Sequence, residues 1–235
     1  LASGFRLAKQ LGKIPVVAGV CDGFIGNRIL ARYREAADLL LLHGATPAQI
    51  DRAMTGFGYA VGPYEAQDMS GLDIAFANRR RQDANRDPNR TYVHIADKMV
   101  EAGRLGRKTG LGWYSYANDG KAGADPLVDA LIIAESDHAG INRRHFSDDD
   151  ITKRLLLAMI NEGALILQEA IAQNAGDIDL VSVLGYGFPR WRGGLMHYAD
   201  QLGMVAILAG LKDFSAEDPH IWQPSQLILD AVKTK

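Results

Sequence analysis

The chain has 235 residues and a formal net charge of −2, with 47% hydrophobic and 23% charged residues. This composition is typical of a folded globular protein and excludes a disordered or fibrous chain. The nearly balanced charge favours neither a nucleic acid nor an anionic membrane surface as a partner. The single cysteine, Cys21, excludes an intrachain disulfide and a zinc site built from several cysteines.

No apolar run approaches the ~20 residues that a membrane-spanning helix needs. The chain begins at Leu1, and no charged segment followed by an apolar stretch marks a signal peptide. We therefore interpret Leu1 as an expression or processing boundary, and we expect a cytoplasmic protein of one or two domains.

The first residues predict a helix, a strand and a second helix. Residues 2–11 have helical apolar spacing and end before Gly12, and the β-branched run 14–20 predicts a buried strand. A long helix is expected over 24–42, closed by Gly44. Its apolar face carries Ile25, Ile29, Leu30, Tyr33, Ala37, Leu40 and Leu41.

Shorter helices are expected next. Thr46 can cap a helix whose first turn contains Gln49, the pair that forms a capping box, and this helix ends near Gly56. The stretch 64–81 is also helical in pattern, although Gly71 interrupts it.

The middle of the chain predicts a helix over 91–102 and an aromatic, hairpin-like segment at 113–116. Residues 117–126 have the composition of a linker, and 125–134 forms a modest helix. Ser147 and the three aspartates after it begin a long helix that we expect to reach residue 172.

The second half repeats the order of features of the first half. Each half has an Ile-x-x-Arg helix start, then an Ile-Asp pair, then a loop of glycines and aromatics with a proline, then a further helix. The matching segments are 25–28 and 151–154, 50–51 and 178–179, and 56–63 and 185–189. We predict an internal duplication; the alternative is a chance similarity of two amphipathic helical hairpins.

Several residues that suggest chemistry are better explained by structure. Gly56, Gly58 and Gly62 follow a helix, not a strand, and their spacing is one residue too long for a dinucleotide fingerprint. The histidines show no metal-ligand spacing, and we expect surface or capping roles for His43, His94, His138, His145, His197 and His220. Cys21 is expected to be a small packing residue.

Two stretches carry functional signals. Asn27 lies in the first turn of the expected 24–42 helix, where its amide can orient a hydroxyl or a carbonyl group. Arg107 and Lys108 are adjacent cations in a glycine-rich loop, which suits a phosphate. The alternatives are a polar residue in a helix turn and a solvated loop.

Together these stretches resemble a known family. Residues 22–28 and 106–114 are similar to the two signatures that bracket the C-terminal domain of 3-hydroxyacyl-CoA dehydrogenases, and 62–73 resembles the segment between them. Residues 147–156 and 185–194 resemble a second copy found in multifunctional enzymes of fatty-acid β-oxidation. The resemblance covers nearly the whole chain.

The resemblance implies a mainly α fold of two tandem, related helical modules, similar to the C-terminal domain of 6-phosphogluconate dehydrogenase. The last helix and strand of a Rossmann domain precede them. The implied organisation is a Rossmann remnant at 1–21, a first module at 22–117, a linker at 118–145 and a second module at 146–235.

The resemblance also implies an NAD-dependent oxidoreductase that acts on a CoA thioester. The catalytic histidine, its glutamate and the NAD-binding fold are expected upstream of Leu1. In this chain, Asn27 is expected to lie beside that histidine and the substrate, Lys108 to approach NAD, and Leu184 and Tyr186 to flank the substrate. No metal is expected.

The implied partners are the acyl-CoA substrate, the protein's own upstream Rossmann and enoyl-CoA hydratase domains, and a second copy in a homodimer; no nucleic acid or membrane span is expected. The chain alone is expected to be inactive. One alternative is a non-catalytic acyl-CoA-binding or dimerisation module. Another is the helical domain of a different β-hydroxyacid dehydrogenase, which the tandem copy and the 107–110 loop disfavour.

Overall fold

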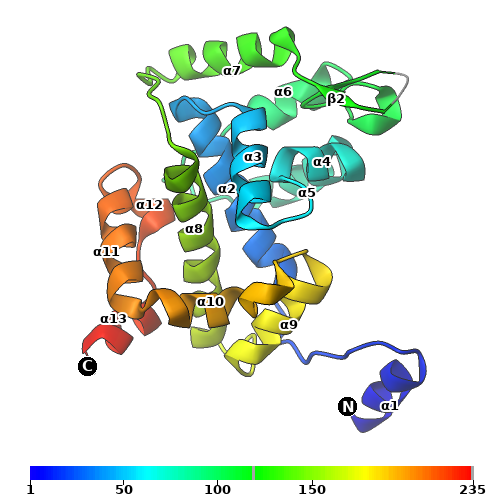
Figure 1. Cartoon of the computed structure of the whole chain (residues 1–235), viewed down its shortest axis with the longest axis vertical. Helices are drawn as coiled ribbons and strands as arrows, with labels where there is room; N and C mark the ends of the chain where they lie inside the picture. The colour runs from blue at the N-terminus through cyan, green and yellow to red at the C-terminus, as the bar shows by residue number, and fades with distance from the viewer. Residues whose placement is uncertain (118–119, 234–235) are drawn as a thin grey trace. The chain divides into compact units, whose positions relative to one another are not determined.

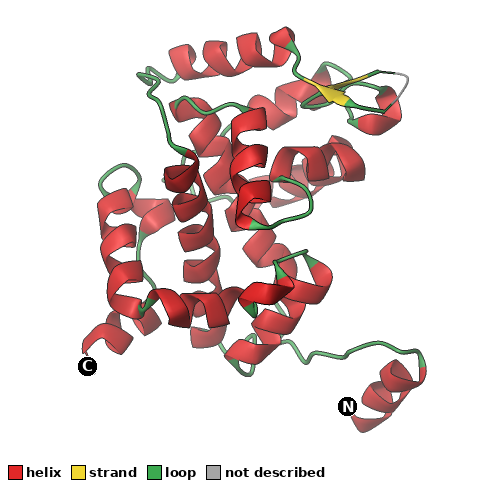
Figure 2. Ribbon diagram, viewed as in Figure 1, coloured by secondary structure: helices red, strands yellow, loops and turns green. Residues whose placement is uncertain are grey.

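Helices dominate the computed structural model, which describes residues 1–117 and 120–233 (Figures 1 and 2). The α-helices are α1 (Ala2–Gln10), α2 (Gly26–His43), α3 (Pro47–Phe57), α4 (Pro63–Ser70), α5 (Leu72–Gln82), α6 (Ile95–Glu101), α7 (Pro126–His138), α8 (Asp148–Gln168), α9 (Ala175–Gly185), α10 (Leu195–Leu202), α11 (Met204–Ser215), α12 (Pro219–Trp222) and α13 (Gln226–Lys233). The 3-10 helices are η1 (Asp83–Asn85), η2 (Arg107–Thr109) and η3 (Arg190–Arg192). The prediction of a mainly α fold is confirmed.

One small sheet is present in the described part of the chain. Its strands, β1 (Ser115–Tyr116) and β2 (Ala122–Gly123), pair antiparallel with Ser115 opposite Gly123. This agrees with the hairpin-like segment expected at 113–116. Residues 118–119, within the predicted linker, and 234–235, at the end of the predicted second module, lie outside the described residues.

The residue contacts divide the chain into two compact units. Unit 1 comprises Leu1–Ala31, Met159–Lys212 and Pro224–Lys235, and unit 2 comprises Arg32–Ala158 and Asp213–Gln223. Helices α2 and α8 each contribute residues to both units. The units therefore follow contacts in space, whereas the predicted modules follow the order of the chain.

Each unit has its own core of apolar side chains. The predicted apolar face of α2 is buried except for Leu30. Large, fully buried side chains in unit 2 are Leu41, Ile50, Met54, Tyr64, Ile95, Met99 and Trp113. Buried side chains in unit 1 are Ile25, Ile160, Ile166, Ile178, Phe188 and Leu195.

The helix starts largely follow their capping residues. Thr46 Oγ1 accepts a hydrogen bond from the Gln49 backbone N–H at 3.2 Å, and Ser147 Oγ accepts one from the Asp150 backbone N–H at 3.1 Å. The predicted capping box is wrong in its second half. The Gln49 side chain is instead turned toward the segment before α8, where its Nε2 donates to the backbone oxygen of Phe146 at 2.7 Å.

The predicted strand at 14–20 does not form. Ala18 makes an isolated antiparallel bridge with Ala172, and the Gly19 N–H donates to the Ile171 oxygen at 2.8 Å. A β-branched run becomes a strand only where a neighbouring strand completes the ladder. No such neighbour lies beside it in the described parts of the chain.

Three helices also differ from their expected bounds. Helix α6 begins at Ile95 instead of residue 91, and α8 ends at Gln168 instead of residue 172. Helix α7 extends to His138, with Asp125 accepting from the Leu127 N–H at 3.0 Å, so the predicted linker 118–145 contains a helix of 13 residues.

The two halves of the chain share their local architecture. Helices α3 and α9 are both 11 residues long, and α4 and α10 are both 8 residues long. A single glycine with a positive φ then joins each short helix to the next one: Gly71 (φ 92°) and Gly203 (φ 81°). The same order of lengths and turns supports the proposed duplication.

A second shared feature is a carboxylate at the start of the short helix. Asp51 accepts hydrogen bonds from the backbone N–H groups of Tyr64 and Glu65, both at 2.9 Å. Asp179 accepts from Met196 at 2.6 Å and from His197 at 3.2 Å. Each aspartate therefore satisfies amides that a helix start leaves without a partner.

A glycine before each short helix lets the aspartate come close to the backbone of that helix start. A Cβ added to Gly62 would overlap Asp51, and one added to Gly194 would overlap Asp179. In each half, the aspartate of the Ile-Asp pair therefore packs against the glycine that ends the following loop. We propose, on this basis, that the duplication comprises residues 22–117 and 146–235.

Candidate functional site

The candidate substrate site in unit 1 pairs Asn27 with Tyr186. Asn27 lies in the first turn of α2, and Tyr186 follows the last residue of α9. The Tyr186 hydroxyl donates to Asn27 Oδ1 at 2.8 Å, although the two residues are 159 positions apart. A Cβ on Gly26 would overlap the Tyr186 ring, so the glycine permits this close approach.

The bond to Tyr186 determines what the Asn27 amide can do. Because Oδ1 accepts from the phenol, the Nδ2 amino group is left as the donor on an exposed side chain. The Tyr186 side chain beside this donor is 37% exposed, and Leu184, two residues before it, is 46% exposed. The Asn27 amide can therefore donate a hydrogen bond to an oxygen atom, and the exposed part of the Tyr186 ring can contact an apolar chain.

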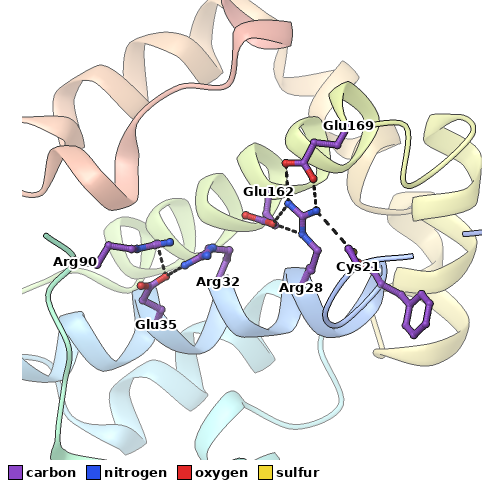
Figure 3. A network of polar contacts seen from close by, with 8 residues as sticks. Cys21, Arg28, Arg32, Glu35, Arg90, Glu162 and Glu169 are labelled. Atoms are coloured by element: carbon purple, nitrogen blue, oxygen red, sulfur yellow. Dashed lines mark hydrogen bonds and ion pairs between the residues drawn. The ribbon is translucent and has the colours of Figure 1, made fainter. Parts of the chain in front are cut away.

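An arginine beside Asn27 fixes the start of α2 (Figure 3). Arg28 Nε donates to Glu162 Oε1 at 2.8 Å, and Nη1 donates to Glu169 Oε2 at 2.5 Å. Nη1 also lies 3.9 Å from Cys21 Sγ. Burial alone would lower the pKa of the guanidinium, but the bonds to Glu169 and Glu162 more than offset this and raise it.

Unit 2 contains a separate network of the same kind, also drawn in Figure 3. Glu35 on α2 accepts from Arg32 and, at 2.8 Å, from Arg90. Arg90 lies in the segment between η1 and α6, so this carboxylate ties that segment to α2.

Lys108 lies in unit 2, within η2. Its Nζ is 2.5 Å from Asp73 Oδ1, and Arg107 Nη2 is 2.6 Å from Glu65 Oε1. Both cations of the expected phosphate loop therefore have acidic partners. A phosphate would bind there by sharing or displacing Asp73, which is 39% exposed.

Asp68 organises the loop that carries Lys108. Its buried carboxylate accepts from the N–H groups of Trp113 (2.9 Å) and Tyr114 (3.0 Å) and from the Tyr116 hydroxyl (2.8 Å). Burial raises the pKa of this carboxyl, and these bonds oppose the rise. A Cβ on Gly106 or Gly112 would overlap Asp68. Glycine at positions 106 and 112 therefore allows the backbone of this loop to pack directly against Asp68.

Asp51 is linked to the same loop, because the Tyr114 hydroxyl donates to its Oδ2 at 2.7 Å. Burial raises the pKa of Asp51 to about 6 from its ordinary value of 3.8, although the bonds from Tyr114 and two backbone amides lower it. Since the folded pKa is the higher one, this group contributes stability that is complete below pH ~4 and is lost as the pH rises through about 6.

We therefore expect a pH-dependent difference between the wild type and Asp51→Asn. The stability advantage of the wild type should shrink by up to ~3 kcal/mol between pH 4 and pH 7, because one pKa unit corresponds to about 1.4 kcal/mol. Urea unfolding at several pH values measures this, with the surface change Asp129→Asn as control. An advantage that stays constant over this range would contradict the assignment.

The remaining candidate groups have structural surroundings. His43 is the last residue of α2, where burial lowers its pKa, and His197 Nε2 lies 3.1 Å from the Gln201 side chain. Gly58 ends α3 with a φ of 126°. Among the described residues there is no group of three or more potential metal ligands and no helix long and apolar enough to cross a membrane.

The sequence missed two features of the site. Arg28 marked the repeat, but its acidic partners lie more than 130 residues away and no local pattern indicates them. Phe24 is 52% exposed with a φ of 50°, a left-handed conformation that is rare for an aromatic residue. The glycine-rich turn at 21–26 was the available signal for it.

The comparisons with known proteins point to one group of enzymes. Residues 23–116 match the family described as the C-terminal domain of 3-hydroxyacyl-CoA dehydrogenase. The chain is 39% identical to a peroxisomal bifunctional enzyme of Danio rerio over 97% of this chain and 34% of that protein. It is 35% identical to a glyoxysomal fatty acid β-oxidation multifunctional protein of Cucumis sativus over 93% of this chain and 31% of that protein.

Solved structures show the same fold. The dehydrogenase part of multifunctional enzyme 1 from C. elegans has a TM-score of 0.72 and 27% identity, over 98% of this chain and 52% of that one. The 3-hydroxybutyryl-CoA dehydrogenase of Escherichia coli has a TM-score of 0.74 and 22% identity, over 96% of this chain and 62% of that one.

The chain spans about a third of the length of the curated relatives that it matches. Within that length, the match includes both Asn27 and Lys108. Residues 23–116 therefore match the family of 3-hydroxyacyl-CoA dehydrogenase C-terminal domains, and the chain as a whole is similar to part of the multifunctional enzymes of fatty-acid β-oxidation.

Proposed function

We propose that this chain supplies the helical, substrate-facing part of an NAD-dependent L-3-hydroxyacyl-CoA dehydrogenase of fatty-acid β-oxidation. The bond between Tyr186 and Asn27 is the observation that carries the proposal. It joins two residues that were assigned to the substrate from two different motifs. The proposed role of the pair is to hold an oxygen atom of the acyl thioester.

The chemistry of this role follows from the amide. A 3-hydroxyacyl thioester has a hydroxyl at C3 and a thioester carbonyl, and either oxygen can accept from Asn27 Nδ2. The phenol of Tyr186 holds the amide in one orientation, which reduces the cost of ordering it when the substrate binds. Leu184 offers apolar contact to the acyl chain.

NAD would supply the hydride acceptor. Within this chain Lys108 is the residue proposed to approach it, and its half-exposed ammonium group suits a phosphate. The described residues contain no parallel sheet with a glycine-rich loop, so they do not by themselves form a dinucleotide site. The proposal therefore requires the upstream Rossmann domain.

A substitution at Gly26 tests the substrate role. Gly26→Ala suits a helix, yet its Cβ would displace the Tyr186 ring and release the Asn27 amide. We expect acetoacetyl-CoA, titrated into the chain by calorimetry, to bind about fivefold more weakly, the value of one lost hydrogen bond. Gly56→Ala is the matched control, since nothing lies within 4 Å of its added Cβ.

Two further outcomes decide the proposal. The chain mixed with 3-hydroxybutyryl-CoA and NAD should form no measurable NADH, because the proposed Rossmann domain supplies the general base and positions the cofactor. If acetoacetyl-CoA binds equally well to both glycine variants and to the wild type, the proposed site is wrong. A dimer in solution without any ligand binding would favour the dimerisation module instead.

The cellular location stays a prediction. The sequence led us to expect the cytoplasm, whereas relatives named peroxisomal or glyoxysomal belong to those organelles. Imaging of the tagged full-length protein together with a peroxisomal marker would distinguish the two.

A further inference from the structure

One loop of the second half is longer than its counterpart in the first half. Residues 58–62 connect α3 to α4, whereas the longer segment 186–194 connects α9 to α10 in the corresponding place. The longer connection contains η3, whose sequence is Arg190-Trp191-Arg192. This loop begins with Tyr186 of the proposed substrate site.

The longer loop is held firmly at both ends. The Phe188 N–H donates to the Ser182 backbone oxygen at 3.0 Å, and the Leu195 N–H donates to Ser182 Oγ at 3.3 Å. Phe188 is buried, and Gly193 ends η3 in the left-handed conformation that glycine accommodates. The hydrogen bonds at both ends of the loop therefore hold η3 in place.

Those central residues form an exposed aromatic and cationic surface. Trp191 is 72% exposed, and the guanidinium carbon of Arg192 lies 4.0 Å from the centroid of a Trp191 ring. Arg190 is exposed and has no acidic partner among the residues that the structure describes. A cation thus lies over the indole, and most of the Trp191 side chain is still exposed.

We propose that Arg190, Trp191 and Arg192 bind the adenine nucleotide end of the CoA thioester. The exposed indole stacks on the adenine ring, as aromatic side chains do with bases, and the guanidinium groups contact the phosphates. This inference rests on the proposed function, because it assigns the far end of the same substrate.

The length of the chain permits one ligand to reach both places. Five residue steps separate Tyr186 from Trp191, so their Cα atoms lie at most ~18 Å apart. An extended CoA thioester can therefore place its acyl oxygen at Asn27 and its nucleotide at η3. The loop 186–194 then contacts the substrate at both ends.

The tryptophans make this testable in the chain itself. Trp113 and Trp222 are 1% and 3% exposed, so Trp191 is the tryptophan open to a soluble quencher. We expect acetoacetyl-CoA to protect the fluorescence from acrylamide. Acetoacetyl-dephospho-CoA, which lacks the 3′-phosphate, should bind several-fold more weakly. NAD, which has an adenine nucleotide without that phosphate, should protect less than acetoacetyl-CoA at equal concentration.

Variants assign the effect to individual residues. Trp191→Ala should weaken acetoacetyl-CoA binding about tenfold in calorimetry, the value of one stacked base. Arg190→Ala should weaken binding and reduce the preference for the 3′-phosphate. Lys212→Ala, an exposed cation on α11, is the matched control and should change neither property. Circular dichroism of each variant establishes that the fold is retained.

The outcomes separate this inference from the proposed function. If acetoacetyl-CoA binding is weakened by Gly26→Ala but not by Trp191→Ala or Arg190→Ala, the nucleotide site is wrong and the proposed function stands. If no CoA thioester binds, both fail. If Trp191 becomes protected only when the full-length protein is assembled and ligand has no effect, the loop is a protein contact and the inference is overturned.

Discussion

Replacing Arg28 with methionine is expected to lower the free energy of unfolding by about 3 kcal/mol. Its guanidinium is the cation beside Glu162, which is only 5% exposed. Methionine keeps much of the apolar stem but removes the guanidinium from beside that buried carboxylate. The expected loss is at the lower end for a broken buried pair, because Arg28 is itself 17% exposed and Glu169 is 46% exposed.

Urea unfolding of three variants tests this cause. The double variant Arg28→Met with Glu162→Gln removes both charges, and it should recover part of the stability lost in the single variant. Arg52→Ala breaks a pair with Asp148 in which both side chains are well exposed, and it should have little effect. Additive losses in the double variant would show that the buried charge is not the reason.

The same substitution bears on function, since Arg28 directly follows Asn27. If the ion pairs hold the first turn of α2 in place, the Asn27 amide should lose its fixed orientation when they are removed. Binding of acetoacetyl-CoA to Arg28→Met is then expected to weaken even where the chain is still folded. The position of Asn27 thus depends on α8, a helix far away in the sequence.

Local features of the fold could be predicted from the sequence, because their causes are local. Thr46 and Ser147 cap the helices that follow them, and Gly71 separates two short helices as its interruption of the pattern indicated. The β-branched run at 14–20 failed for the opposite reason. Its conformation depends on a neighbouring strand, which no local pattern provides.

The site shows the same division. The sequence indicated Asn27, Lys108 and Tyr186 one by one, through motifs and resemblance. It could not show that Tyr186 donates to Asn27, or that Lys108 already pairs with Asp73. Those contacts arise from packing between segments that are distant in the chain, so only the structure provides them.

The glycines of the 106–112 loop illustrate how a motif changes meaning. In sequence they suggest a loop that approaches a phosphate. In the structure Gly106 and Gly112 lie against Asp68, whose carboxylate takes the place that an anionic ligand would occupy beside backbone amides. An internal anion therefore organises this loop, and Lys108 is carried on it.

Replacing Asp68 with alanine is accordingly expected to have the second large effect. It would leave the N–H groups of Trp113 and Tyr114 and the hydroxyl of Tyr116 without their acceptor. Because unsatisfied buried donors cost about 1–3 kcal/mol each and the phenol can turn to water, we expect a loss of roughly 3–4 kcal/mol. Asp68→Asn keeps one acceptor oxygen and should lose less.

Amide hydrogen exchange distinguishes this cause from general destabilisation. In Asp68→Ala the amides of Trp113 and Tyr114 should lose more protection than helical amides of α3, because the loop opens locally before the unit unfolds. Asp73→Ala is the matched control, since it removes the partner of Lys108 but leaves the bonds to Asp68 intact. Equal loss of protection in the loop and in α3 would mean that Asp68 stabilises unit 2 as a whole. The local role of Asp68 in holding the loop that carries Lys108 would then be wrong.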